Sequence, residues 1–91
     1  MNAIERVSVF GLGKLGSCIA ATLAMRGFQV LGVDIDPEKV RRVNEGLPPV
    51  EEPLLGDTIK HGRSSLRATL EVKEALEARL ARVLAARPGG R

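Results

Sequence analysis

Aromatic side chains, cysteine and histidine are all scarce in this chain of 91 residues, which contains two Phe, no Trp, no Tyr, one Cys and one His. A single cysteine cannot form a disulfide within the chain, and one Cys with one His cannot assemble a metal site, so we predict neither feature. The chain also lacks the run of roughly 18 apolar residues that a membrane-spanning helix needs. Its short N-terminal lead contains an acid, Glu5, and no signal-peptide cleavage pattern. We therefore expect a soluble, cytoplasmic protein without a membrane partner.

Basic residues outnumber acidic ones only modestly, giving a net charge of +3. Residues 1–57 carry six basic and eight acidic side chains, whereas residues 58–91 carry eight basic and three acidic ones. A basic tail is compatible with nucleic-acid binding, but side chains for base stacking are nearly absent and no nucleic-acid-binding motif is present. We therefore predict no nucleic-acid partner.

The most informative segment is an apolar run at residues 7–10 that leads into a Gly-x-Gly-x-x-Gly sequence, Gly11-Leu12-Gly13-Lys14-Leu15-Gly16. In this pattern the first glycine allows a tight turn out of a strand, the second lets a phosphate approach the backbone, and the third lets a helix lie close to the strand. The N-terminus of that helix offers free N–H groups and a partial positive charge to an anion. We predict that these six residues bind the pyrophosphate of a dinucleotide.

The chain after the turn supplies the helix and second strand that this interpretation requires. Small residues at positions 16, 20 and 24 predict a helix that packs closely on a sheet and ends at Gly27. Residues 28–33 are nearly all apolar, which is typical of a strand buried on both faces of a parallel sheet. The larger side chains at helical spacing form a predicted apolar stripe of Leu15, Cys18, Ile19, Thr22 and Leu23.

Asp34 ends this second strand, about 20 residues beyond the glycines, where a carboxylate accepts hydrogen bonds from the hydroxyls of the adenosine ribose. The same carboxylate would repel a 2′-phosphate, which favours NAD over NADP as the cofactor. The alternative is that the glycines make only a tight turn and that Asp34 is an ordinary polar residue at a strand end. Lys14 is likewise either a phosphate contact or a solvated side chain.

Further turn and helix signals follow Asp34. The pair Asp36-Pro37 is an N-cap and a first-turn proline, and it predicts a short helix that ends at Gly46. Lys39 lies in its first turn, either as a cofactor contact or as a surface lysine. A proline-rich loop over residues 47–53, a short helix over residues 54–60 and a third strand over residues 66–70 come next. We predict an α/β fold, a partial Rossmann (doubly wound) fold with a parallel sheet of about three strands and flanking helices.

Four segments, GLGKLG, GVDIDPEKV, EEPLL and LRATLEV, resemble the N-terminal end of the nucleotide-sugar dehydrogenases of the UDP-glucose/GDP-mannose dehydrogenase family. The resemblance implies that Leu15 lies on the pyrophosphate, that Asp34 is the ribose acid and that Lys39 is a further cofactor-contacting lysine. It also implies NAD as the cofactor, and a nucleotide sugar as the partner of a full-length relative. That family oxidises the 6-hydroxyl of the sugar to a carboxylate in two steps, with two NAD per turnover and a cysteine-bound intermediate.

The resemblance ends near residue 75. We predict that residues 1–75 are the N-terminal half of a dinucleotide-binding domain and that residues 76–91 are a divergent Ala/Arg-rich helical tail, since apolar side chains from Val72 to Leu84 have helical spacing before Pro88. The family has a fourth strand beside the first at this point. Without it, the first strand would have an unpaired edge, so we expect self-association through that edge or through the terminal helix.

The family's nucleophilic cysteine and catalytic lysine lie far downstream and are absent here. Cys18 does not correspond to that cysteine and is expected to be a small core residue, so we assign no catalytic residue and expect the chain alone to be inactive. The sequence is interpreted as a truncated or frame-shifted product, or an excerpt, of a nucleotide-sugar dehydrogenase.

Two alternatives stay open. In the first, the chain is a stand-alone nucleotide-binding or interaction module without catalysis. In the second, it is a fragment of another NAD-dependent family, such as the hydroxyacyl-CoA or phosphogluconate dehydrogenases. The EEPLL and LRATLEV segments argue against these other families, because they are not general features of dinucleotide-binding folds.

Overall fold

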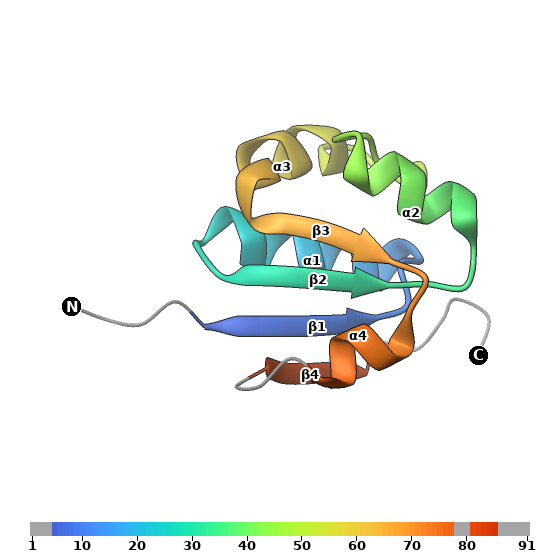
Figure 1. Cartoon of the computed structure of the whole chain (residues 1–91). Helices are drawn as coiled ribbons and strands as arrows, with labels where there is room; N and C mark the ends of the chain where they lie inside the picture. The colour runs from blue at the N-terminus through green and yellow to red at the C-terminus, as the bar shows by residue number, and fades with distance from the viewer. Residues whose placement is uncertain (1–4, 78–80, 86–91) are drawn as a thin grey trace.

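The computed structural model describes residues 5–77 and 81–85. Within them the chain alternates between strands and helices in the order expected of a parallel α/β fold (Figure 1). The elements are β1 (Arg6–Phe10), α1 (Lys14–Met25), β2 (Gln29–Val33), α2 (Pro37–Asn44), α3 (Leu55–His61), the 3-10 turn η1 (Arg63–Ser65), β3 (Leu66–Thr69), α4 (Val72–Glu77) and β4 (Ala81–Ala85). In this part of the chain, no helix is both long and apolar enough to cross a membrane.

The four strands are all parallel and lie in the order β3-β2-β1-β4. The predicted partial Rossmann fold is therefore confirmed. In Figure 1, α1 lies behind the strands and α4 lies in front of them. β1 is an inner strand, and its Val9 is paired with Gly32 of β2 on one side and with Leu84 of β4 on the other.

Two predictions about the C-terminal segment are wrong. The helix predicted from Val72 to Leu84 covers only α4, and residues 81–85 form the fourth strand. β1 consequently has no unpaired edge, and association of chains through that edge loses its basis. A short apolar run fits a helix and a strand about equally well, and pairing with the backbone of β1, which is distant in sequence, decides between them. The domain boundary at residue 75 and self-association by another route stay predictions.

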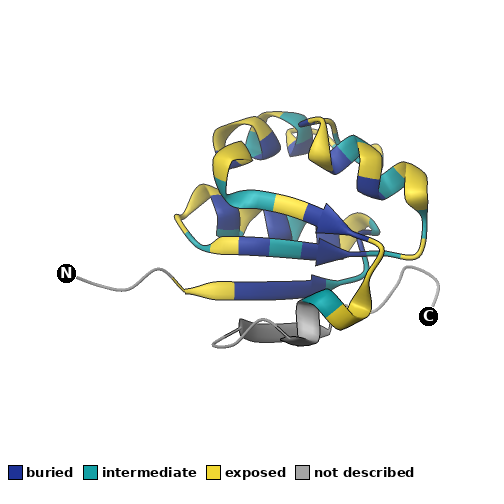
Figure 2. Cartoon of the chain, in the orientation of Figure 1, coloured by how far each residue is buried: buried dark blue, intermediate teal, exposed yellow. Residues whose placement is uncertain are grey.

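The buried face of α1 consists of small residues. Gly16, Ser17, Ala20, Ala21 and Ala24 are buried, whereas Leu15 of the predicted apolar stripe is 62% exposed. Figure 2 shows the same mixture of buried and exposed positions along the helices, beside the buried middle of β1. Small side chains let the helix approach the sheet closely, and bulkier neighbours on α1 then pack at the margin of the contact. The small-residue row was predicted correctly, but the stripe was placed too far toward the exposed side.

The main core lies between the sheet and the helices α1 and α2. It comprises the buried residues Val7, Val9, Leu12, Ala20, Ala24, Val30, Val40, Val43 and Ala68. A second cluster, Ala21 with Leu55 and Ile59, joins α1 to α3. Gly62, the C-cap of α3, lies directly against the end of α1, because a Cβ at this position would be 2.6 Å from the backbone nitrogen of Met25.

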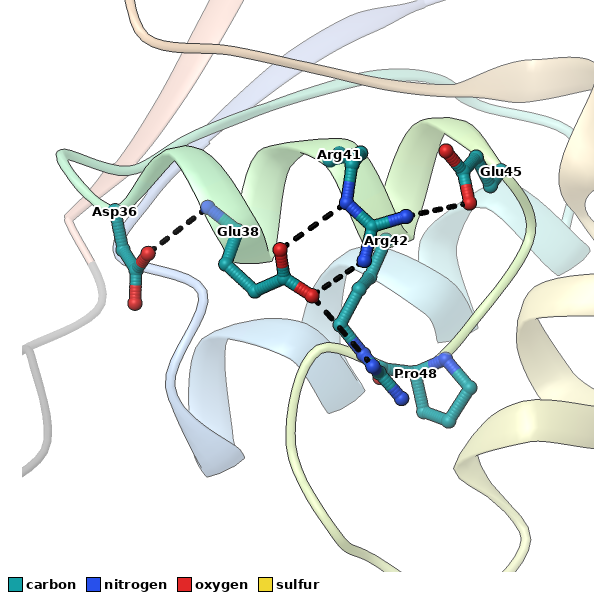
Figure 3. A network of polar contacts seen from close by, with 6 residues as sticks. All are labelled: Asp36, Glu38, Arg41, Arg42, Glu45 and Pro48. Atoms are coloured by element: carbon teal, nitrogen blue, oxygen red, sulfur yellow. Dashed lines mark hydrogen bonds and ion pairs between the residues drawn. The ribbon is translucent and has the colours of Figure 1, made fainter.

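Helix α2 begins as predicted, with the side chain of Asp36 accepting a hydrogen bond from the N–H of Glu38 at 2.9 Å. Figure 3 shows the ionic network along its exposed side, where Arg41 joins Glu38 to Glu45. Arg42 also pairs with Glu38, and its Nε donates to the carbonyl of Pro48 at 2.8 Å. This last bond ties the proline-rich loop to α2.

Asn44, the last residue of α2, protects the outer edge of the sheet. Its amide nitrogen donates to the carbonyl of Ala68 in β3 at 3.0 Å, and its amide oxygen accepts from the N–H of the same residue at 2.8 Å. The side-chain amide thus satisfies the two backbone groups that a further strand would otherwise pair.

Candidate dinucleotide-binding site

The candidate site lies where β1 runs into α1. Gly11 has φ +98°, a conformation that favours glycine, and its N–H donates to the carbonyl of Val33 at 2.7 Å. Gly13 is the N-cap of α1, and neither a capping side chain nor an acidic residue in the first turn occupies the helix N-terminus. The helix itself therefore supplies no anion to the N–H groups of that turn, which leaves them available as a pyrophosphate site requires.

Leu12, between the two glycines, is held from three directions. Its N–H donates to Oδ2 of Asp34 at 2.7 Å, and its carbonyl accepts from the hydroxyl of Ser17 at 2.8 Å. Its side chain is only 1% exposed and lies over Gly32, where a Cβ would come within 2.8 Å of Leu12 Cδ2. The turn is thus fixed in shape by the protein alone, and less ordering remains to be done when a ligand binds.

Asp34 is half-buried at the end of β2, and both of its carboxylate oxygens have backbone partners. Oδ2 accepts from Leu12, and Oδ1 accepts from the N–H of Asp36 at 2.9 Å. Because a carboxylate offers about four acceptor positions, two hydrogen bonds leave capacity for ribose hydroxyls. The structure therefore brings the glycine turn and the predicted ribose acid into direct contact. These features fit a dinucleotide, and the ribose role stays a prediction.

Lys14 forms a contact that the sequence did not suggest. Its Nζ lies 3.3 Å from Oε1 of Glu52, although its side chain is 74% exposed. Glu52 belongs to the loop between α2 and α3, in the EEPLL segment, which lies far from Lys14 in the sequence. Leu15 is exposed at the next position of the turn, and Lys39 is half-buried in the first turn of α2. The cofactor contacts of Lys14, Leu15 and Lys39 stay predictions.

Three residues of this site were missed from the sequence: Ser17, Gly32 and Glu52. Gly32 had a usable signal, because a glycine inside an apolar strand often marks a close approach by another group. Ser17 directly follows the third glycine. Its hydrogen bond to the carbonyl of Leu12 could not be predicted before the conformation of the turn was known. Glu52 is one of two adjacent acids, and only the fold tells them apart.

Cys18 is half-buried one turn after Lys14, and it packs against the second core cluster. Burial raises the pKa of its thiol, the charge of Glu52 raises that pKa further, and the charge of Lys14 lowers it. A thiol with a raised pKa carries less of the reactive thiolate at neutral pH. The geometry thus agrees with the expected packing role and gives no support for a nucleophile.

The comparisons with known proteins converge on one family. The model for the NAD-binding domain of the UDP-glucose/GDP-mannose dehydrogenase family matches residues 5–85. GDP-mannose 6-dehydrogenase of Azotobacter vinelandii is 43% identical over 73 residues, which cover 78% of this chain and 17% of that protein. This chain therefore spans about a sixth of the length of that relative.

Solved structures give the same result. A UDP-glucose dehydrogenase from the archaeon Pyrobaculum islandicum matches with a TM-score of 0.84 and 30% identity, over 92% of this chain and 20% of that one. A GDP-mannose dehydrogenase from Pseudomonas aeruginosa matches with a TM-score of 0.78 and 34% identity, over 91% of this chain and 20% of that one. These matches favour the nucleotide-sugar dehydrogenases over the other NAD-dependent families considered above. The chain belongs to the UDP-glucose/GDP-mannose dehydrogenase family and matches its NAD-binding domain.

Proposed function

We propose that this chain binds the adenosine and pyrophosphate groups of NAD at the turn between β1 and α1. The observation that carries the proposal is the contact between Leu12 and Asp34, which fixes an uncapped helix N-terminus and a ribose-binding acid in one rigid unit. In this proposal the backbone from Gly11 to Gly16 holds the pyrophosphate, with the side chains of Leu15 and Lys39 at the margins of the site. The carboxylate of Asp34 accepts the ribose hydroxyls and repels a 2′-phosphate.

The proposed role within a full-length protein is the cofactor-binding part of a nucleotide-sugar oxidoreductase. Bound NAD would accept a hydride from the sugar hydroxyl, while this part of the chain binds and orients the adenosine end of the cofactor. The relatives named above act on UDP-glucose or GDP-mannose, so a nucleotide sugar is the proposed substrate class. The 91 residues on their own are proposed to bind NAD without turning over a nucleotide sugar.

Isothermal titration of the purified chain with NAD tests the proposal. We expect measurable binding of NAD, weaker binding of NADP, and loss of both in Gly13→Val, because a side chain at Gly13 blocks the approach of the pyrophosphate. Equal affinities for NAD and NADP would contradict the ribose assignment, and NAD binding that survives in Gly13→Val would contradict the pyrophosphate assignment.

A parallel assay separates binding from catalysis. Absorbance of reduced NAD is followed with UDP-glucose and, separately, with GDP-mannose as substrate. Binding of NAD without reduction supports the proposed binding role of this chain, whereas reduction would show that it carries catalytic groups that we have not assigned. The cytoplasmic location stays a prediction from the sequence, which cell fractionation checks.

A further inference from the structure

The EEPLL segment is one of the four segments that carry the resemblance to this family, and it lies outside the residues proposed to bind NAD. In the structure, its second acid, Glu52, reaches the nucleotide-binding turn. The side chain of Glu52 is 26% exposed, and its Oε1 is shielded from solvent and accepts no hydrogen bond within the described residues. The charged group beside that oxygen is the ammonium of Lys14, 3.3 Å away.

Lys14 is the first residue of α1, directly after Gly13, which places it at the proposed pyrophosphate site. Its side chain is 74% exposed, and a pair with one well-hydrated partner contributes little and opens easily. The long flexible stem of lysine lets the ammonium move between neighbouring anions. Lys14 can therefore serve either the carboxylate of Glu52 or a bound phosphate.

The loop that carries Glu52 is held in place independently of Lys14. Val50 packs against the second core cluster, which includes Ala21 of α1, and Arg42 binds the carbonyl of Pro48. The carboxylate thus stays near the helix N-terminus when the ammonium leaves. Its shielded oxygen would then lose its charged partner, at a small cost of the size of an exposed ion pair, and NAD binding would have to offset this cost.

We propose that Glu52 and the pyrophosphate of the dinucleotide compete for Lys14, and that Glu52 thereby lowers the affinity of the site for NAD. The inference rests on the proposed function and adds a regulatory contact to the same site. It also gives the EEPLL segment a role, since this segment supplies the competing anion.

The test is isothermal titration of NAD at low ionic strength into the 91-residue chain and four variants: Glu52→Gln, Lys14→Met, the double variant and Glu51→Gln. Glu52→Gln is expected to tighten binding about two- to fivefold, the range for an exposed ion pair. Lys14→Met is expected to weaken binding, and adding Glu52→Gln to it should change the affinity less than about 1.5-fold. Glu51→Gln removes the same charge from the adjacent exposed position and should leave the affinity unchanged.

A titration of the Cys18 thiolate by its ultraviolet absorbance reports, without NAD, whether the charges of Glu52 and Lys14 both lie near this thiol, as the competition requires. Because Glu52 raises the pKa of this thiol and Lys14 lowers it, Glu52→Gln should lower that pKa and Lys14→Met should raise it. Glu52→Asp keeps the charge but withdraws the carboxylate from Lys14, so it should tighten NAD binding, although less than Glu52→Gln does. This variant keeps the competition testable if Glu52→Gln does not fold.

The outcomes separate this inference from the proposed function. If the unmodified chain binds no NAD, the proposed function fails, and the inference fails with it. If the unmodified chain binds NAD but a folded Glu52→Gln binds it equally or more weakly, only the competition is wrong. An equal gain in the Lys14→Met background, or in Glu51→Gln, would also overturn it, because the effect would then be one of general charge.

Discussion

The N–H of Leu12 donates a hydrogen bond to Oδ2 of Asp34 at 2.7 Å, so the acid that ends β2 also holds the glycine-rich turn that follows β1. Asp34 therefore has one role that the structure shows and one that is proposed. It is the proposed ribose acceptor, and it fixes the backbone that is proposed to receive the pyrophosphate. Any substitution at this position is expected to affect both.

Replacing Asp34 by Ala should weaken NAD binding by about 1–3 kcal/mol, because charged hydrogen bonds to the ribose are lost. It should also lower the free energy of unfolding, since the N–H groups of Leu12 and Asp36 lose their acceptors. Titration with NAD and chemical denaturation measure the two effects. Ser17→Ala is the matched control: it removes the hydrogen bond to the carbonyl of Leu12 and should reduce stability by about 1 kcal/mol while affecting NAD less than Asp34→Ala does. An Asp34→Ala chain with unchanged NAD affinity would contradict the ribose role.

Gly62 should tolerate no side chain. A Cβ would lie 2.6 Å from the nitrogen of Met25 and 2.8 Å from the carbonyl carbon of Ala24, and these backbone atoms cannot move without displacing α1. We expect Gly62→Ala to lower stability by about 1–3 kcal/mol, the usual range for overpacking. Thermal and denaturant unfolding measure the change.

Gly56→Ala provides the comparison within the same helix, α3. A Cβ there would make ordinary contact with Pro48 at 3.8 Å, and alanine favours the helix by roughly 0.5–1 kcal/mol over glycine. Stability should therefore rise or stay constant in Gly56→Ala. Equal losses in the two variants would show that the cost at Gly62 is not the clash with α1.

Asn44→Ala should open the outer edge of β3. The backbone N–H and carbonyl of Ala68 would lose the side-chain amide that now binds both, at a cost of about 1–2 kcal/mol in stability. An edge strand with unpaired groups is a template for association, so sedimentation should show a larger assembled fraction for the variant than for the unmodified chain at the same concentration. Identical sedimentation of the two chains would mean that α2 protects the edge without Asn44.

Acid should weaken the network on α2. Hydrogen bonding from Arg41 holds the pKa of Glu38 below its ordinary value, so the stabilising effect of its charge is present above the ordinary carboxyl pKa and is lost as pH falls through the lowered one. Denaturation at a series of acidic pH values should show a steeper loss of stability in the unmodified chain than in Glu38→Gln. Because the network is exposed, added salt should reduce the difference. Parallel pH profiles would contradict this role of Glu38.

The sequence was sufficient for features that depend on local spacing. The turn from Gly11 to Gly16, the N-cap at Asp36 and the acid at the end of β2 are each encoded within a few residues, and the structure places them as predicted. Leu12 and Asp34 are hydrogen-bonded although they are 22 residues apart in the sequence. Only the known geometry of the dinucleotide-binding motif predicts that they lie close together.

The features that were missed depend on contacts between distant segments. β4 is a strand because its backbone pairs with that of β1. This pairing joins segments that are distant in sequence, so the residues of β4 alone do not indicate it. Glu52 and its neighbour Glu51 are equivalent in sequence, and the path of the loop decides which of them meets Lys14. The clash that forbids a side chain at Gly62 likewise exists only once α3 lies on α1.

The position of β4 has a consequence for where a ligand can enter. β2 and β3 lie on one side of β1, and β4 lies on the other, so the connection after β1 and the connection after β3 lead away from each other. In doubly wound sheets, such a topological switch point leaves a crevice at the carboxyl ends of the strands. Gly11 and the start of α1 stand at that point. The opening proposed for the dinucleotide thus depends on strand order, and a substitution that detached β4 would remove one wall of it without altering any residue proposed to touch the cofactor.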